Sequence, residues 1–60
     1  MKYKLYITNY DTLKTEEIKE YDVNASDVRK LFTSLKKKYK GKLLTMIRFK
    51  DGKWYNFLRS

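Results

Sequence analysis

Residues 43–59 have the sequence LLTMIRFKDGKWYNFLR, which predicts a β-hairpin with its turn at Asp51-Gly52. Asp-Gly between alternating segments is a strong hairpin signal, because a type I′ turn needs positive φ at both central residues. A two-residue turn pairs Lys50 with Lys53, Phe49 with Trp54, Arg48 with Tyr55, Ile47 with Asn56 and Met46 with Phe57. The period of two along a strand then sorts the side chains of the hairpin onto two faces.

One face of this hairpin is predicted to enter the core, and it holds Leu43, Thr45, Ile47, Phe49, Trp54, Asn56 and Leu58. The opposite face holds Leu44, Met46, Arg48, Lys50, Lys53, Tyr55, Phe57 and Arg59. Because this second face mixes cations with aromatic rings, it is the candidate functional surface.

Two strands and one helix are predicted before the hairpin. Residues 2–9 alternate, so the side chains of Tyr3, Leu5 and Ile7 point one way, as in a half-buried strand. Residues 15–23 form a second strand whose acidic side chains suit a sheet edge, and Ile18 lies out of phase with the later apolar positions. A helix over residues 26–40 carries one apolar stripe, formed by Val28, Leu31, Phe32, Leu35 and Tyr39.

The order strand, strand, helix, strand, strand predicts an α+β fold of a single domain, residues 1–60. Two hairpins that share one helix bury their inward faces most simply as one four-stranded sheet with the helix on one side. Short connections and a right-handed crossover favour a mixed sheet of strand order 2-1-4-3, in which the first and last strands are parallel neighbours.

The first two-thirds of the chain resembles the immunoglobulin-binding domain of streptococcal protein G, a β-grasp module. The matching pieces are Tyr3-Lys4-Leu5, Thr12-Leu13-Lys14 with Glu16, Val23-Asn24-Ala25 and Lys30-Leu31-Phe32. The resemblance implies a β-grasp fold but not antibody binding. Arg29 stands where the family has an acidic contact residue, Thr33 stands where it has a lysine, and the family's third-strand Trp has no match.

Composition restricts the function of the chain. There is no His and no Cys among the 60 residues, which removes the commonest acid–base group and thiolate metal sites, so we predict neither an enzyme, a cofactor nor a metal site. No apolar run has the length of a signal peptide or a membrane span, and the lack of Cys fits a reducing compartment, so we predict a cytoplasmic location.

The net charge of +8 is unevenly distributed. Residues 1–25 hold four Lys against five acids, whereas residues 26–60 hold eleven Lys and Arg against two acids. Such asymmetry favours a polyanionic partner, although a lysine run near a helix C-terminus also complements the helix dipole without any ligand.

The sequence therefore predicts a small domain that binds nucleic acid through the sheet face opposite the helix, with cations along the phosphates and rings against the bases. The predicted interface consists of Lys2, Lys4, Tyr6, Arg48, Lys50, Lys53, Tyr55, Phe57 and Arg59. Two alternatives stay open: a protein partner bound by the same face or by an edge strand, and self-association as a homodimer. The same rings also pair across strands in proteins that bind no ligand there.

Overall fold

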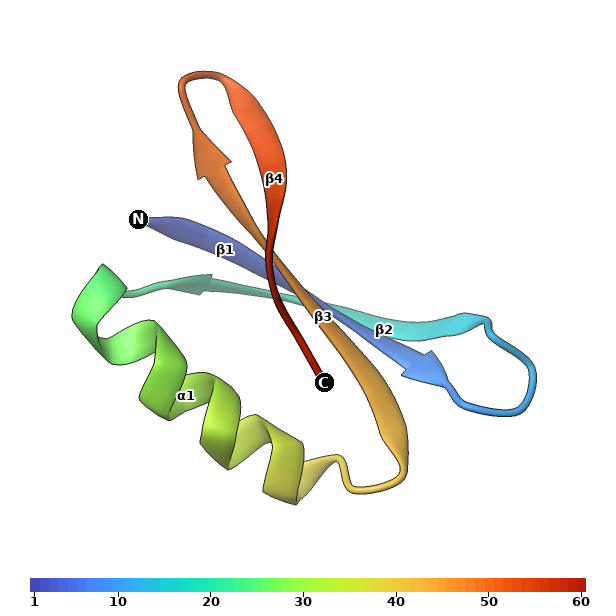
Figure 1. Ribbon diagram of the computed structural model, residues 1–60. Coiled ribbons are helices and arrows are strands. Elements are labelled where there is room, and N and C mark those ends of the chain that lie inside the picture. The colour runs from blue at the N-terminus through green and yellow to red at the C-terminus, as the bar shows by residue number, and fades with distance from the viewer.

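A computed structural model describes residues 1–60. Its elements are β1 (Lys2–Asn9), β2 (Thr15–Asp22), α1 (Ala25–Lys38), β3 (Lys42–Lys50) and β4 (Lys53–Arg59). The four strands form one sheet, and α1 packs on one side of it (Figure 1), so the fold is α+β, with the element order that the sequence predicts. Helix α1 falls short, in length and in apolar content, of what a helix needs to cross a bilayer.

The strand order is β2-β1-β3-β4, and every neighbouring pair is antiparallel. The predicted order 2-1-4-3 is wrong, the sheet is not mixed, and the β-grasp topology is not confirmed. The physical reason lies in the apolar content of the two strands of the second hairpin. A central strand has a neighbour on each side and is more enclosed than an edge strand, so the more apolar strand of the hairpin takes the central position. β3 carries Leu43, Leu44, Met46 and Ile47 and is enclosed along most of its length, whereas β4 is exposed from Lys53 to Asn56.

The turn at Asp51-Gly52 is confirmed, since Asp51 has φ 51° and Gly52 has φ 78°. The predicted pairing is also confirmed from Lys50–Lys53 as far as Ile47–Asn56. Beyond this point the predicted pair of Met46 with Phe57 is wrong, because Met46 lies opposite Leu58 and the register shifts between Met46 and Ile47. The shift leaves Phe57 as an extra residue in β4, which is the feature of a β-bulge.

Eight side chains form the buried core: Tyr3, Leu5, Ile7, Val28, Phe32, Leu35, Leu44 and Met46. The predicted inward faces of β1 and α1 are therefore confirmed. In β3 the predicted parity is wrong, because Leu5 lies opposite Met46 and Ile7 opposite Leu44. Directly opposed residues share a face of the sheet, so the even positions of β3 face α1 and the odd positions face away.

Trp54 is accordingly outside the core, with 38% of its surface exposed, whereas Phe57 and Leu58 pack against the core. The prediction that Trp54 enters the core is wrong. Leu58 does contact the core as predicted, although the bulge, rather than simple alternation, brings both Phe57 and Leu58 there.

Helix α1 begins after Asn24, whose side chain makes no capping hydrogen bond. Lys36, Lys37 and Lys38 occupy its last turn, where cations complement the helix dipole. Gly41 then has φ 87°, a left-handed conformation that glycine adopts readily, and it allows the chain to turn into β3.

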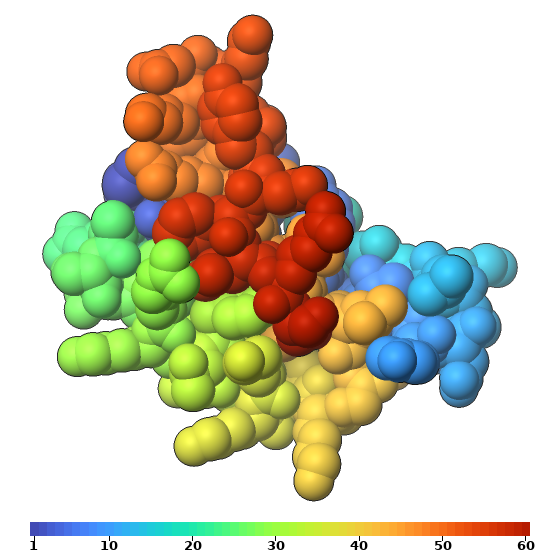
Figure 2. All heavy atoms as spheres, in the orientation of Figure 1, coloured from blue at the N-terminus to red at the C-terminus, as the bar shows by residue number.

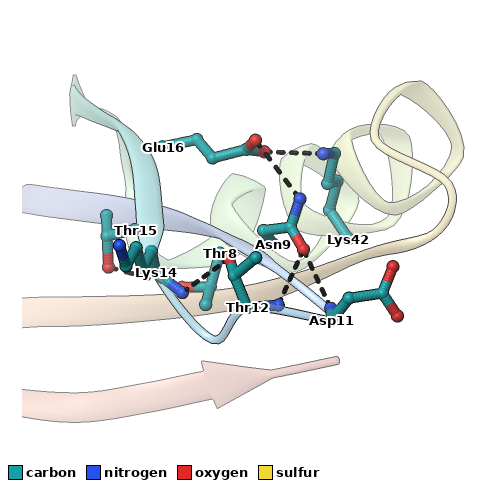
Figure 3. Close-up of polar contacts among 8 residues, drawn as sticks. All are labelled: Thr8, Asn9, Asp11, Thr12, Lys14, Thr15, Glu16 and Lys42. Atoms are coloured by element: carbon teal, nitrogen blue, oxygen red, sulfur yellow. Dashed lines mark hydrogen bonds and ion pairs between the residues drawn. The ribbon is translucent and has the colours of Figure 1, made fainter.

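The β1–β2 turn is tied to the start of β3 by a small polar cluster (Figure 3). Asn9 Oδ1 accepts hydrogen bonds from the backbone N–H groups of Asp11, at 2.8 Å, and Thr12, at 3.0 Å. The Asn9 amide donates to Glu16 at 3.5 Å, and Lys42 Nζ lies 2.6 Å from Glu16 Oε1. Glu16 therefore joins β2 to the first residue of β3, across the end of β1.

We expect Glu16 to make the stability of the fold depend on pH. Its hydrogen bonds from Lys42 and, second, from Asn9 hold the pKa of Glu16 below its ordinary value of 4.5. Ionised Glu16 therefore stabilises the fold above that value, and the contribution is lost as the pH falls through the lowered pKa. Glu16→Gln should lower the thermal unfolding midpoint at neutral pH, and the gap from the wild type should close in acid.

The matched control is Glu17→Gln, because Glu17 takes part in none of the three ion pairs of the chain. A gap between the wild type and Glu16→Gln that is the same at neutral pH and at about pH 3 would contradict this role of Glu16.

Candidate nucleic-acid interface

The nine residues of the predicted interface do not share one face of the sheet. Lys2, Lys4, Tyr6 and Arg59 lie on the face that α1 leaves uncovered, since Tyr6 and Arg59 both lie opposite Thr45 and Lys4 lies opposite Ile47. The other five lie on the α1 side of the sheet: Arg48, Lys50, Lys53, Tyr55 and Phe57. The prediction of one continuous interface is wrong, because it depended on the predicted inward face of β3, which is the reverse of the observed one.

The five residues on the α1 side gather on the β3–β4 hairpin, whose tip projects past α1 (Figure 1). The same tip, coloured orange, stands clear of the rest of the molecule in Figure 2. Together with Arg29 of α1 they form a group that we call the hairpin site, which consists of Arg29, Arg48, Lys50, Lys53, Tyr55 and Phe57.

Phe57 is the centre of the hairpin site. The guanidinium carbons of Arg29 and Arg48 each lie 5.7 Å from the centroid of its ring, so the two groups cannot be farther apart than twice this distance. The ring of Tyr3, a fully buried residue, lies 5.7 Å from Phe57 on the core side. Phe57 is thus held by the core and positions two arginines, which is a different role from the base stacking that the sequence predicts for it.

Arg29 is a member of the site that the sequence analysis missed. In α1 it follows Val28 and lies off the apolar stripe, as the solvated lysines of the helix also do. No local signal separates it from its neighbours, because its meeting with Phe57 depends on how α1 lies across the sheet.

The cations of the hairpin site lack acidic partners. None of the three ion pairs in the chain includes Arg29, Arg48, Lys50 or Lys53. Lys50 lies directly opposite Lys53, and like charges in this arrangement repel each other. Arg48 Nε is shielded from solvent and has no hydrogen-bond partner. An anion at this site would relieve the repulsion between the two lysines.

A hollow of about 360 Å³ adjoins two of these cations, Arg48 and Lys50. It is lined by Arg48, Lys50, Asp51, Tyr55, Asn56 and Phe57, so Asp51 is its one acidic residue. Half of the surface of Tyr55 is exposed, and Tyr55 lies opposite Arg48 across the hairpin. Ligand pockets in proteins begin at about 300 Å³, so the hollow is large enough for a flat aromatic group beside the exposed ring.

Comparisons of the chain with models of protein families, with curated proteins and with solved structures find no match.

The uncovered side of the sheet, which we call the open face, has a different character. Two of its cations are paired with acids of β2: Lys4 Nζ lies 3.9 Å from Glu20, and the N-terminal ammonium lies 3.1 Å from the Asp22 carboxylate. Lys2, which lies opposite Asp22, and Arg59 make no ion pair. Its large apolar side chains are Tyr6, Ile18, Leu43, Ile47, Phe49 and Trp54. An apolar surface whose cations are partly paired is a poorer match for a polyanion than the hairpin site.

No group of three or more acidic, His or Cys side chains comes together in the structure to hold a metal ion. The chemistry available at the hairpin site is that of four cations and one phenol. Arginine binds phosphate or carboxylate oxygens in a bidentate geometry, whereas lysine acts as a flexible point charge.

Proposed function

We propose that this chain is a small binding domain, without catalytic activity of its own, that binds single-stranded nucleic acid through the hairpin site. The observation that carries the proposal is a group of four cations without an ion-pair partner, of which Arg48 and Lys50 line a hollow together with half-exposed Tyr55, at a hairpin that projects from the molecule. Backbone phosphates need unpaired cations, and unstacked bases need an exposed ring face.

Each residue of the site has a proposed role. Arg29 and Arg48, which both approach Phe57, bind phosphate oxygens through their guanidinium groups. Lys50 and Lys53 neutralise the next phosphate along the strand, and this contact relieves their mutual repulsion. Tyr55 stacks on a base in the adjoining hollow, a contact that is worth about 1–3 kcal/mol by alanine substitution in other single-strand binders.

The salt dependence of binding tests the proposal. The wild-type chain is titrated with labelled single-stranded DNA and RNA and with the corresponding duplexes at several salt concentrations. Log K for the single strands should fall linearly with log salt, with a slope of about −0.7 for each contacted phosphate, hence about −2.8 if four cations are engaged. Tighter binding of the duplex would contradict the single-strand proposal and would place the hairpin in a groove. No binding of either form at low ionic strength would overturn nucleic-acid binding altogether.

A further inference from the structure

We infer that the open face packs against the open face of a second copy of this chain. Helix α1 covers one side of the sheet only, and no second layer of the chain covers the other (Figure 1). The inference concerns a surface separate from the hairpin site, and it does not depend on the proposed function.

The first reason is the apolar character of the open face. Ile18 has 58% of its surface exposed, and Phe49 and Trp54 each have 38% exposed. Phe49 and Trp54 contact each other edge to face, with their ring centroids 5.0 Å apart, and Lys4 Nζ lies 4.6 Å from the Trp54 ring centroid. Apolar side chains that adjoin each other on an uncovered sheet, rather than being scattered singly, mark an interaction site.

The second reason is charge. The chain has a net charge of +8, and on the open face Glu20 and Asp22 offset two of the four cations, which are Lys2, Lys4, Arg59 and the N-terminal ammonium, so 4 − 2 leaves +2. Most of the net charge therefore lies outside the surface through which two copies would approach. Each copy also presents both signs of charge, and an isologous interface can pair the acids of one copy with the cations of the other.

The third reason is size. The Cα positions span 34 × 22 × 14 Å, so 34 × 22 bounds the area of any one side of the molecule at on the order of 700 Å², and the packing of a whole side would approach the roughly 800 Å² that each partner buries in a standard interface. The single core of this 60-residue chain consists of eight buried side chains, and domains of this size commonly gain stability by association. Face-to-face packing of two sheets would create a second core between them.

This arrangement leaves the other side of each copy free. In the dimer the two helices and the two hairpin sites lie on the outer sides, so the uncompensated cations stay in solvent and the proposed nucleic-acid surface stays accessible. A partner with a different apolar surface, or stacked bases, would compete for the same open face, and the experiment below separates these occupants.

The test is the oligomeric state without nucleic acid, measured by sedimentation equilibrium over a range of concentrations. The wild type should reach twice the 7.4 kDa mass of the chain. Because Trp54 is the one tryptophan and lies on the open face, its fluorescence emission should shift to shorter wavelength, and its quenching by iodide should fall, over the same concentration range. Ile18→Lys and Phe49→Lys should each raise the dissociation constant of the dimer by about tenfold or more, because each places a charge twice in the apolar interface.

The matched control is Leu13→Lys, which replaces a residue that is 70% exposed in the β1–β2 loop and should leave the dimer unchanged. Circular dichroism verifies that all three variants are folded. A wild type that remains monomeric at every concentration would overturn the inference, as would a dimer that both open-face variants leave intact. A monomer whose Trp54 is quenched by oligonucleotide would also overturn it, and would assign the open face to bases.

Discussion

Leu44→Ala should lower the free energy of unfolding by about 2–5 kcal/mol, whereas Leu43→Ala, one position earlier in β3, should lower it by only about 1 kcal/mol. Leu44 is 1% exposed, lies opposite Ile7 and belongs to the core between the sheet and α1. Its truncation loses the burial of the side chain and also leaves a cavity. Leu43 is half-buried on the open face, where truncation leaves no enclosed cavity.

Urea unfolding of both variants measures the difference. Both are made in the Ile18→Lys background, so that association through the open face does not add to the apparent stability. A domain of this length has about 3–9 kcal/mol of stability in total, so Leu44→Ala can unfold the chain completely. Leu44→Met, which keeps the volume and should cost less than about 1.5 kcal/mol, then shows that the position itself is compatible with folding. Equal losses for Leu43→Ala and Leu44→Ala would contradict the parity of β3.

Lys50→Gln with Lys53→Gln should weaken single-strand binding by about 25-fold at about 0.1 M salt. The two lysines face each other across the Asp51-Gly52 turn and have no acidic partner among the ion pairs of the chain. If each lysine contacts one phosphate, replacing both reduces the magnitude of the slope of log K against log salt by about 1.4. Affinities that are equal near 1 M salt then differ by about 25-fold at about 0.1 M salt. Fluorescence anisotropy with a labelled oligonucleotide gives both the affinity and the slope.

Lys30→Gln with Lys37→Gln is the matched control, because it removes the same charge from two exposed positions of α1 outside the hairpin site. This variant should change the slope far less. Equal effects of the two double variants would mean that net charge alone attracts the nucleic acid, and the hairpin site would lose its role. Arg48→Lys keeps the charge but loses the planar guanidinium, so it should weaken binding while the slope stays nearly unchanged.

The two sides of the sheet differ in where the acids of β2 lie relative to the cations, because Glu17, the β2 acid on the α1 side, lies opposite Ile7 and far from the hairpin tip in the strand order. Glu20 and Asp22 lie opposite Lys4 and Lys2 on the open face, at the edge of the sheet that β2 forms. The hairpin tip lies at the other edge, on β3 and β4, where Asp51 is the one acid nearby. The open face is therefore apolar with cations that are partly paired with acids, whereas the cations of the hairpin site have no ion-pair partner, and this difference favours different partners for the two surfaces.

Local pattern was sufficient for the elements of this fold. Alternation in residues 2–9, the apolar stripe of the helix, Gly41 and the Asp51-Gly52 turn each depend on interactions within a few residues, and all are present in the structure. The hairpin pairing near the turn follows from the turn geometry alone, and it too is as predicted.

Long-range packing settled the rest. β3 has apolar side chains on both faces, with Leu43 and Ile47 on one and Leu44 and Met46 on the other. Alternation therefore defines two faces of this strand without saying which one is inward. Pairing of β3 with β1 made that choice, because it set Leu44 and Met46 opposite Ile7 and Leu5 beneath α1. Strand order, the bulge at Phe57 and the approach of Arg29 to that ring follow from the same choice, and all of them join residues that no short segment contains.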